Sequence, residues 1–132
     1  MEIEPYRSVG PMTFGMSTEQ LSELLGEPTL IRKNSKLGET DVRFRRIRTA
    51  ISDHGLVEVG LIPEERPTLR GIDIFNHPNA LNRLNALDGT SREILGFLVF
   101  PKLGITVTGL HDGDSSQLAI TAFVQGRWDR YL

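Results

Sequence analysis

The stretch that decides the fold spans residues 14–28 and reads FGMSTEQLSELLGEP. Ser17 carries a hydroxyl that can accept a hydrogen bond from an unpaired amide of the first helical turn, as an N-cap does. Gln20 stands three residues further on and completes a capping box. Gly26 suits the left-handed position that ends a helix, and Pro28 prevents the helix from continuing. The stretch therefore contains both a start signal and a stop signal for a helix.

The enclosed segment predicts a short amphipathic helix over residues 18–25. Three leucines recur at the spacing of one helical face: they are Leu21, Leu24 and Leu25. A helix of two to three turns is too short to persist alone in water. We therefore expect its leucines to pack against strands that follow in the chain.

The rest of the chain contains one more helical pattern and several patterns typical of strands. A second helix is predicted over 78–87, with Asn76 or His77 as its cap and Asp88-Gly89 as its end. Strands are expected at 30–31, 42–47, 56–62, 69–75, 93–100, 105–110 and 118–124. They come in blocks and do not alternate singly with helices. This order favours an α+β fold, with an antiparallel sheet and two short helices packed on one face.

The length supports one α+β domain, residues 1–132, within which 14–75 and 76–126 are candidate repeat halves. Each half would pair one helix with a small run of strands. Hydrophobic residues make up 39% of the chain and charged residues 24%, which is typical of a globular protein. No apolar run approaches the length of a membrane span, and the acidic start of the chain lacks the apolar core of a secretory signal. We expect a cytoplasmic protein with no membrane contact.

The sequence contains no recognisable catalytic or metal-binding pattern. Cysteine is absent, which excludes disulfides and thiolate sites within these residues. His54, His77 and His111 are isolated in predicted turns, without the spacing of a metal site. The segment 112–116 has the acidic spacing of a calcium loop but lacks the required Gly and Glu downstream. We predict no catalytic residue, no metal site and no cofactor.

Positive charge is concentrated between residues 32 and 48. This segment has seven bases and two acids, although the whole chain has a net charge of −2. With Val42 and Phe44 facing the core, Arg43 and Arg45 should point outward together, and a bulge would let Arg46 and Arg48 extend the row. A solvated surface is one interpretation and a protein-binding surface is another. Nucleic acid is disfavoured because the row lacks the aromatic side chains of a stacking platform.

The end of the chain provides a second candidate surface. Residues 127–131 contain the only tryptophan, Trp128, together with Arg130 and Tyr131. Trp, Tyr and Arg are the side chains that most often dominate the energy of protein interfaces. The alternative is that Trp128 covers an open end of the core. We therefore take Trp128, Arg130 and Tyr131 as candidate partner-binding residues together with the four arginines.

Two segments carry resemblances to known bacterial proteins. Residues 14–28 resemble the first helix of outer-membrane assembly lipoproteins and of beta-lactamase-inhibitor-like domains. The missing cysteine argues against the lipoprotein interpretation. Residues 100–105, followed by a sheet and a final Gly-x-Trp-Asp at 126–129, resemble small cytosolic proteins, some of which act as immunity proteins beside polymorphic toxins. These resemblances imply a helix packed on an antiparallel sheet and a binding role, without assigning any binding residue.

The sequence therefore favours a non-enzymatic protein-binding domain, such as an immunity protein or an inhibitor of a bacterial toxin or enzyme. One alternative is a small-molecule-binding module or an enzyme with a pocket between the sheet and the second helix. Another is a homo-oligomeric structural domain built through an exposed edge strand.

Overall fold

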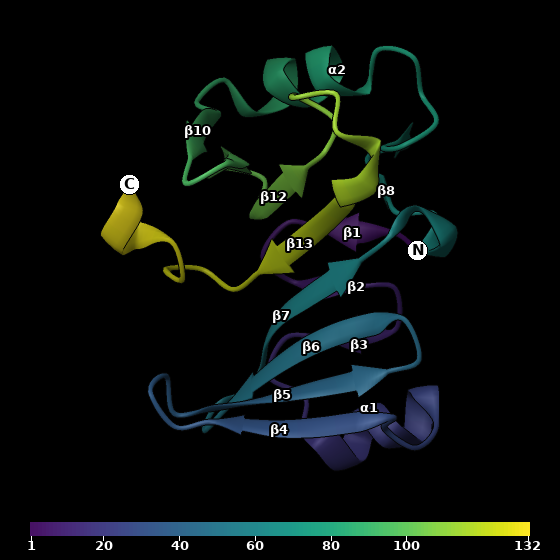
Figure 1. Ribbon diagram of the computed structural model, residues 1–132, viewed down its shortest axis with the longest axis vertical. Coiled ribbons are helices and arrows are strands. Elements are labelled where there is room, and N and C mark those ends of the chain that lie inside the picture. The colour runs from purple at the N-terminus through teal and green to yellow at the C-terminus, as the bar shows by residue number, and fades with distance from the viewer.

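The computed structural model describes residues 1–132, and its largest element is an eight-stranded sheet (Figure 1). Neighbouring strands are antiparallel throughout, in the order β10-β11-β12-β13-β7-β6-β5-β4. The strands are β4 (Leu30–Asn34), β5 (Glu39–Phe44), β6 (Ile47–Ser52), β7 (Gly55–Leu61), β10 (Arg92–Ile94), β11 (Phe97–Phe100), β12 (Ile105–Thr108) and β13 (Ala119–Phe123). With two short helices packed on one face of this sheet, the predicted α+β class is confirmed.

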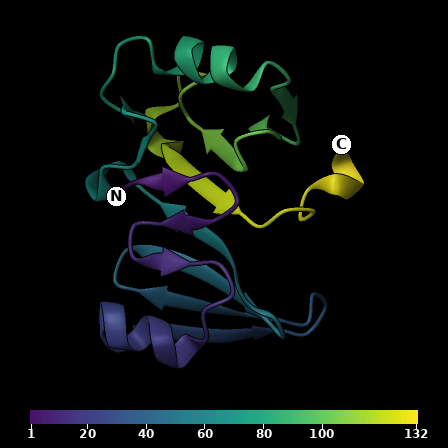
Figure 2. The same cartoon turned by 180° about the vertical axis from the view of Figure 1, so that it is seen from behind.

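A second layer covers one face of the sheet (Figure 2). It contains the helices α1 (Thr18–Leu25) and α2 (Ala80–Asp88), a small sheet of β1 (Ile3–Glu4), β2 (Ser8–Val9) and β3 (Met12–Thr13), and the hairpin of β8 (Thr68–Leu69) and β9 (Ile72–Asp73). The amide of Thr68 donates a hydrogen bond to the carbonyl oxygen of Met1 at 2.9 Å, which joins the two small sheets. Short 3-10 turns occur at Pro63–Glu65, Ser115–Gln117 and Asp129–Tyr131.

The hydrophobic core lies between these two layers and contains 21 buried residues. Alternate residues of the large sheet point into it, because successive side chains of a strand project to opposite faces. Val42 and Phe44 of β5 and Ile105 and Val107 of β12 are each buried in this way. Leu21 of α1 and Leu84 of α2 face them from the covering layer. The opposite face of the sheet carries no helix or second sheet; the tail packs on it where Trp128 meets Phe97 and Phe123.

The same order of elements occurs twice along the chain. A tight hairpin, a helix and a four-stranded antiparallel run occupy residues 8–61 and again residues 68–123. The last strand of each run, β7 in the first and β13 in the second, lies in the middle of the sheet, and the two strands pair with each other from Leu61↔Ile120 to Glu58↔Phe123. The two runs therefore form one continuous sheet.

The first helix confirms the prediction for residues 18–25 in its bounds and its cap. The amide of Gln20 donates to Ser17 Oγ at 3.1 Å, and the amide of Ser17 donates to Gln20 Oε1 at 2.9 Å. The expected apolar face is wrong at one position. Leu21 is buried, but Leu24 is 47% exposed.

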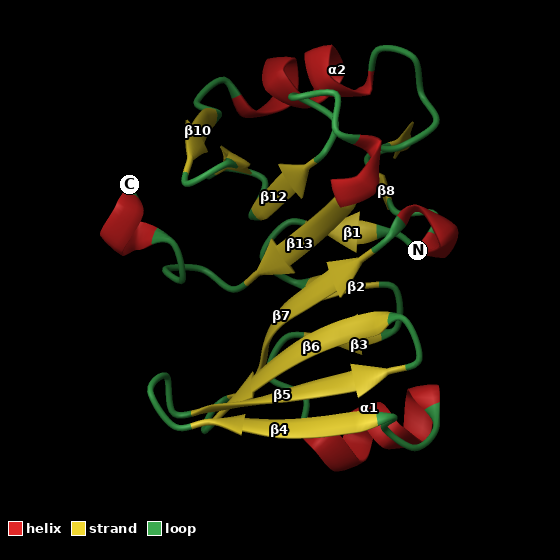
Figure 3. Cartoon of the chain, in the orientation of Figure 1, coloured by secondary structure: helices red, strands yellow, loops and turns green.

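The second helix begins two residues later and ends one residue later than the predicted 78–87. Its N-cap position is Asn79, whose side chain makes no capping bond. The imidazole Nδ1 of His77 instead accepts a hydrogen bond from the amide of Asn79 at 3.0 Å. Figure 3 shows the two helices at opposite ends of the sheet. No helix of this structure has the length and apolar character required to cross a bilayer.

Three of the expected strands are each two strands joined by a two-residue turn. The predicted strand 42–47 turns at Arg45-Arg46, so the apolar pattern slips there because of a hairpin and not a bulge. The predicted strand 69–75 turns at Arg70-Gly71, and the strand 93–100 turns at Leu95-Gly96. Arg45, Arg70 and Leu95 all have positive φ, between 48° and 56°. Such turns require this left-handed conformation at their first central residue.

Tyr6, in the turn between β1 and β2, connects the start of the chain to its second half. Its hydroxyl donates a hydrogen bond to the carbonyl oxygen of Pro101, and its ring packs edge-on against Phe123 at 5.9 Å between centroids. Gly104 has a φ of +66°, and a Cβ there would lie 2.9 Å from the Tyr6 ring. Burial raises the pKa of Tyr6, as do the charges of Asp88 and Asp129. These effects favour the protonated Tyr6 hydroxyl, which is the form that donates to Pro101.

Candidate functional site

The uncovered face of the large sheet carries a row of side chains that crosses all eight strands. The strand registers place its members directly opposite one another, in the order Leu30, Arg43, Arg48, Gly60, Thr121, Thr106, Val99 and Arg92. We call these residues the central row. A parallel row beside it runs through Arg32, Asp41, Ala50, Glu58 and Phe123.

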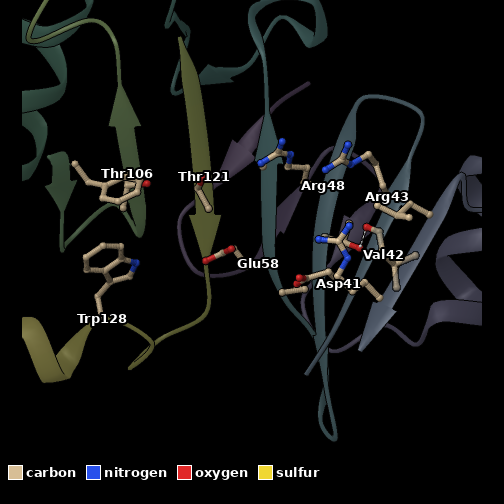
Figure 4. Close-up of a pocket in the computed structure, with 14 residues that line it drawn as sticks. Asp41, Val42, Arg43, Arg48, Glu58, Thr106, Thr121 and Trp128 are labelled. Atoms are coloured by element: carbon tan, nitrogen blue, oxygen red, sulfur yellow. Dashed lines mark hydrogen bonds between the residues drawn. The ribbon is translucent and has the colours of Figure 1, made fainter. Parts of the chain in front are cut away.

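These rows line a hollow of about 540 Å³ (Figure 4). Its walls come from β4 to β7, from β11 to β13 and from Trp128 in the tail. A second hollow of about 390 Å³ shares Arg48, Gly60, Phe97, Thr106 and Thr121 with the first. The two together make one trough along the open face of the sheet, with hydroxyl and guanidinium groups toward its floor and sides.

Three arginines of the hollow have no carboxylate partner within the chain. They are Arg32, Arg43 and Arg48, and none of the ion pairs in the structure includes them. Arg43 and Arg48 stand directly opposite each other on β5 and β6, and Figure 4 shows both side chains on the open face. Like charges placed opposite each other across two strands are destabilising. The repulsion between Arg43 and Arg48 therefore destabilises the fold, and no ion pair within the chain offsets it.

Gly60 lies in the central row between Arg48 and Thr121, on one of the two central strands. Glycine weakens a strand interior, and in such a position it often marks the close approach of a ligand or of another backbone. A Cβ built at Gly60 would meet Arg48 Cβ at 3.5 Å and Thr121 Oγ1 at 3.8 Å, which are ordinary contacts. The fold itself therefore leaves room for a side chain at Gly60. Because Gly60 has no side chain, the floor of the hollow stays open at this position.

The carboxylates near the hollow are largely engaged by an arginine of the tail. Arg127 donates from Nη1 and Nη2 to the two oxygens of Glu39, at 2.6 and 3.0 Å, and from Nε to Glu58 at 3.0 Å. The bonds to Glu39 and the nearby charge of Glu58 raise the pKa of Arg127, against the opposing effect of burial. Asp41, the remaining acid of the hollow, stands opposite Arg32.

Aromatic side chains form the other end of the hollow. The Trp128 ring packs edge-on against Phe97 at 5.7 Å and obliquely against Phe123 at 6.2 Å. Tyr131 packs against the far side of this cluster, 5.3 Å from Trp128, and Arg130 lies over the Tyr131 ring at 5.3 Å. Trp128 and Phe97 line the hollow, whereas Arg130 and Tyr131 do not.

The structure thus separates the seven residues proposed from the sequence. Arg43, Arg48 and Trp128 are brought together in the hollow. Arg45 and Arg46 form the turn between β5 and β6, so the expected outward pairing of Arg43 with Arg45 is wrong. Arg46 borders the second hollow and lies 3.5 Å from Glu65.

Sequence reasoning missed four residues that shape this site, namely Arg32, Gly60, Phe97 and Arg127. Arg32 could have been found from strand alternation, since it shares a face with Leu30 two residues earlier. Phe97 lies in the segment 93–100, which was predicted as one strand but forms a hairpin. The placement of Gly60 and Arg127 depends on which strands are neighbours, and local sequence does not encode that.

The histidines are distributed over separate local structures. His54 is exposed in the turn between β6 and β7, and His77 accepts from the start of α2. His111 lies with Nε2 3.7 Å from Glu93, and its Nδ1 is buried without a partner. No group of three or more His, Asp or Glu side chains is arranged to hold a metal ion. Asp112 and Asp114 accept hydrogen bonds from within their own loop.

Comparison with known proteins adds no assignment. The chain matches no protein-family model, no curated protein and no solved structure.

Proposed function

We propose that this chain is a protein-binding domain that occludes a toxin or an enzyme by accepting a segment of that partner on the open face of its sheet. One observation carries the proposal: the hydrophobic core lies against one face of the large sheet, whereas the other face carries two adjoining hollows. An antiparallel sheet commonly packs one face on the core and leaves the other, polar face in contact with solvent. Here the uncovered face is a trough lined by unpaired arginines and by tryptophan.

The shape of the trough supports a polypeptide as its occupant. Its two hollows adjoin and extend across seven of the eight strands, from β4 through β13 to β11. Interfaces between proteins concentrate binding energy in a few Trp, Tyr and Arg side chains. Arg43, Arg48 and Trp128 provide such side chains within one concave surface. The resemblance of the second half to immunity proteins favours a toxin as the target.

The proposal is tested with a variant that fills the trough from its floor. Gly60→Trp projects a large side chain into the hollow from a position where a Cβ is tolerated. Affinity-tagged wild-type protein should recover a specific partner from the native host, and Gly60→Trp should lose it while retaining the wild-type melting temperature. The purified partner should lose its own activity when the wild-type protein is added.

The matched control is Lys36→Trp, which adds the same side chain in the exposed turn between β4 and β5. It should recover the partner as the wild type does. Equal recovery by the wild type and Gly60→Trp, or no partner at all, would contradict the proposal.

A second candidate is the binding of a small molecule in the same hollow. Its volume of about 540 Å³ lies within the usual range of ligand pockets. Neither of the two hollows is lined by α2, so this site differs from the pocket expected between the sheet and the second helix. A metabolite that raises the melting temperature of the wild type but not of Gly60→Trp would favour this candidate.

A further inference from the structure

The chemistry of the occupant can be inferred from the charges that the hollow leaves unpaired; this inference rests on the proposed protein-binding function. Arg43 and Arg48 face each other in the central row with no acid opposite either of them. Their cross-strand neighbours are Leu30 on one side and Gly60 on the other. Two guanidinium groups in this arrangement present several N–H donors toward the same part of the hollow.

The acids nearby do not neutralise this pair. Glu58 is bound by Arg127, and Asp41 in the neighbouring row forms no ion pair with Arg43 or Arg48. A carboxylate entering between Arg43 and Arg48 would relieve the like-charge repulsion and could accept hydrogen bonds from both. Past Gly60 the central row continues with Thr121 and Thr106, whose hydroxyls can donate to a second acceptor.

The far end of the hollow favours an apolar side chain. Phe97 is 37% exposed, and its ring meets Trp128 edge-on. Both line the hollow on the side opposite the arginines, as Figure 4 shows for Trp128. An aromatic corner of this kind accepts another ring or an aliphatic side chain.

We propose that the hollow binds an acidic segment of the partner protein. In this arrangement one carboxylate of the segment lies between Arg43 and Arg48, its backbone crosses the open floor at Gly60, and an apolar side chain contacts Phe97 and Trp128.

A nucleic-acid strand fits this surface less well. The three unpaired arginines that line the hollow lie on one side of Gly60, whereas a strand of phosphates needs positive charge along its path. A segment with an acidic end and an apolar end matches both sides of the hollow.

The inference is tested by selecting random short peptides from a phage-displayed library on the immobilised protein. The wild type should select peptides rich in Asp and Glu with a nearby apolar residue. Binding of a selected peptide should weaken by about 100-fold or more in Arg43→Glu/Arg48→Glu. That variant should itself select peptides rich in Lys and Arg. Gly60→Trp should select none.

Three further variants keep the result interpretable if the double variant folds poorly. Arg43→Gln/Arg48→Gln removes the charge without reversing it and should lose the acidic preference. Arg48→Glu alone places opposite charges across β5 and β6, so its melting temperature should equal or exceed that of the wild type while its peptide binding falls. Lys36→Glu/Arg45→Glu makes the same total change of charge in two turns outside both hollows and should select acidic peptides as the wild type does.

The outcomes distinguish this inference from the function on which it rests. Selected peptides without acidic enrichment, or no selection by the wild type, overturn the inference. The inference is also overturned if the wild type binds single-stranded DNA, Arg43→Glu/Arg48→Glu abolishes that binding, and the selected peptides show no acidic preference. If Gly60→Trp still loses the partner in those cases, the protein-binding function stands without the acidic segment. If Gly60→Trp retains the partner, the function itself is overturned.

Discussion

Asp88 shows how much one buried carboxylate contributes to this fold. It is the last residue of α2 and is only 2% exposed. Oδ1 accepts from the amide and hydroxyl of Thr90 at 2.9 and 2.6 Å, and Oδ2 accepts from the amides of Lys102 and Leu103 at 2.8 and 3.1 Å. It therefore ties the end of α2 to the turn after β11.

Replacing Asp88 by Ala should lower the free energy of unfolding by about 3 kcal/mol, because buried amides would lose their acceptor. Urea denaturation followed by circular dichroism measures this change. Asp53→Ala is a matched control, since Asp53 is exposed in the turn between β6 and β7 and makes no side-chain hydrogen bond. It should change stability by no more than about 0.5 kcal/mol. Equal midpoints for the two variants would show that the network is unimportant.

The sequence identified Asp88 only as part of a stop signal. Its bonds to Thr90 are local, and Asp followed by Thr two residues later is a pattern that predicts them. Its bonds to Lys102 and Leu103 join residues far apart in the chain, and no spacing rule anticipates them.

At the scale of elements, α1 illustrates what a helical pattern can and cannot specify. The capping box was predictable because all of its partners lie within four residues of one another. The three leucines were assigned correctly to a helix, but the pattern does not say where the sheet lies relative to them. Figure 1 places α1 beside β4 at one end of the sheet, and only Leu21 of the three is fully buried there.

Because Leu21 is buried and Leu24 is half exposed, replacement by alanine should have different effects on stability at the two positions. Leu21→Ala should destabilise the protein by about 2–5 kcal/mol, because it leaves a cavity in the core. Leu24→Ala should cost less than about 1 kcal/mol, since Leu24 is half exposed and alanine favours the helix. Denaturation midpoints of the two variants test the difference. Comparable losses would mean that α1 packs through a different face.

The tight turns explain why three hairpins were predicted as single strands. A two-residue turn with positive φ is normally recognised by Asn, Asp or Gly at its first central position. Arg45, Arg70 and Leu95 occupy that position here. Arginine and leucine give no turn signal, and apolar residues on either side continue the strand pattern. Gly71 and Gly96 at the second position were the signal that could have separated the strands.

At the scale of the whole molecule, the order of the strands determines the site. Strand alternation could place Arg43 and Arg48 on one face, but it could not bring Phe97 or Trp128 to them. That juxtaposition exists because β13 pairs with β7, which joins the two runs of strands into one surface. A sequence reveals which residues of a strand share a face, whereas the neighbours of that strand are decided by the packing of the entire chain.

The shared sheet and core predict that the molecule unfolds as one unit. The 21-residue cluster contains Val42 and Leu56 from the first run and Val107 and Ile120 from the second. Tryptophan fluorescence reports on the tail beside the second run, and far-ultraviolet circular dichroism reports on all helices and strands. The two urea transitions should coincide. Separate midpoints would show that the two runs are independently stable.

The central pairing of β7 with β13 also decides what happens when the polypeptide is divided. A cut in the connection between β7 and β8 leaves each fragment with an unpaired strand at its edge, β7 in the first and β13 in the second. These two strands match each other in register. The fragments are therefore natural halves for a split reporter, whose reassembly rebuilds the trough from its two sides.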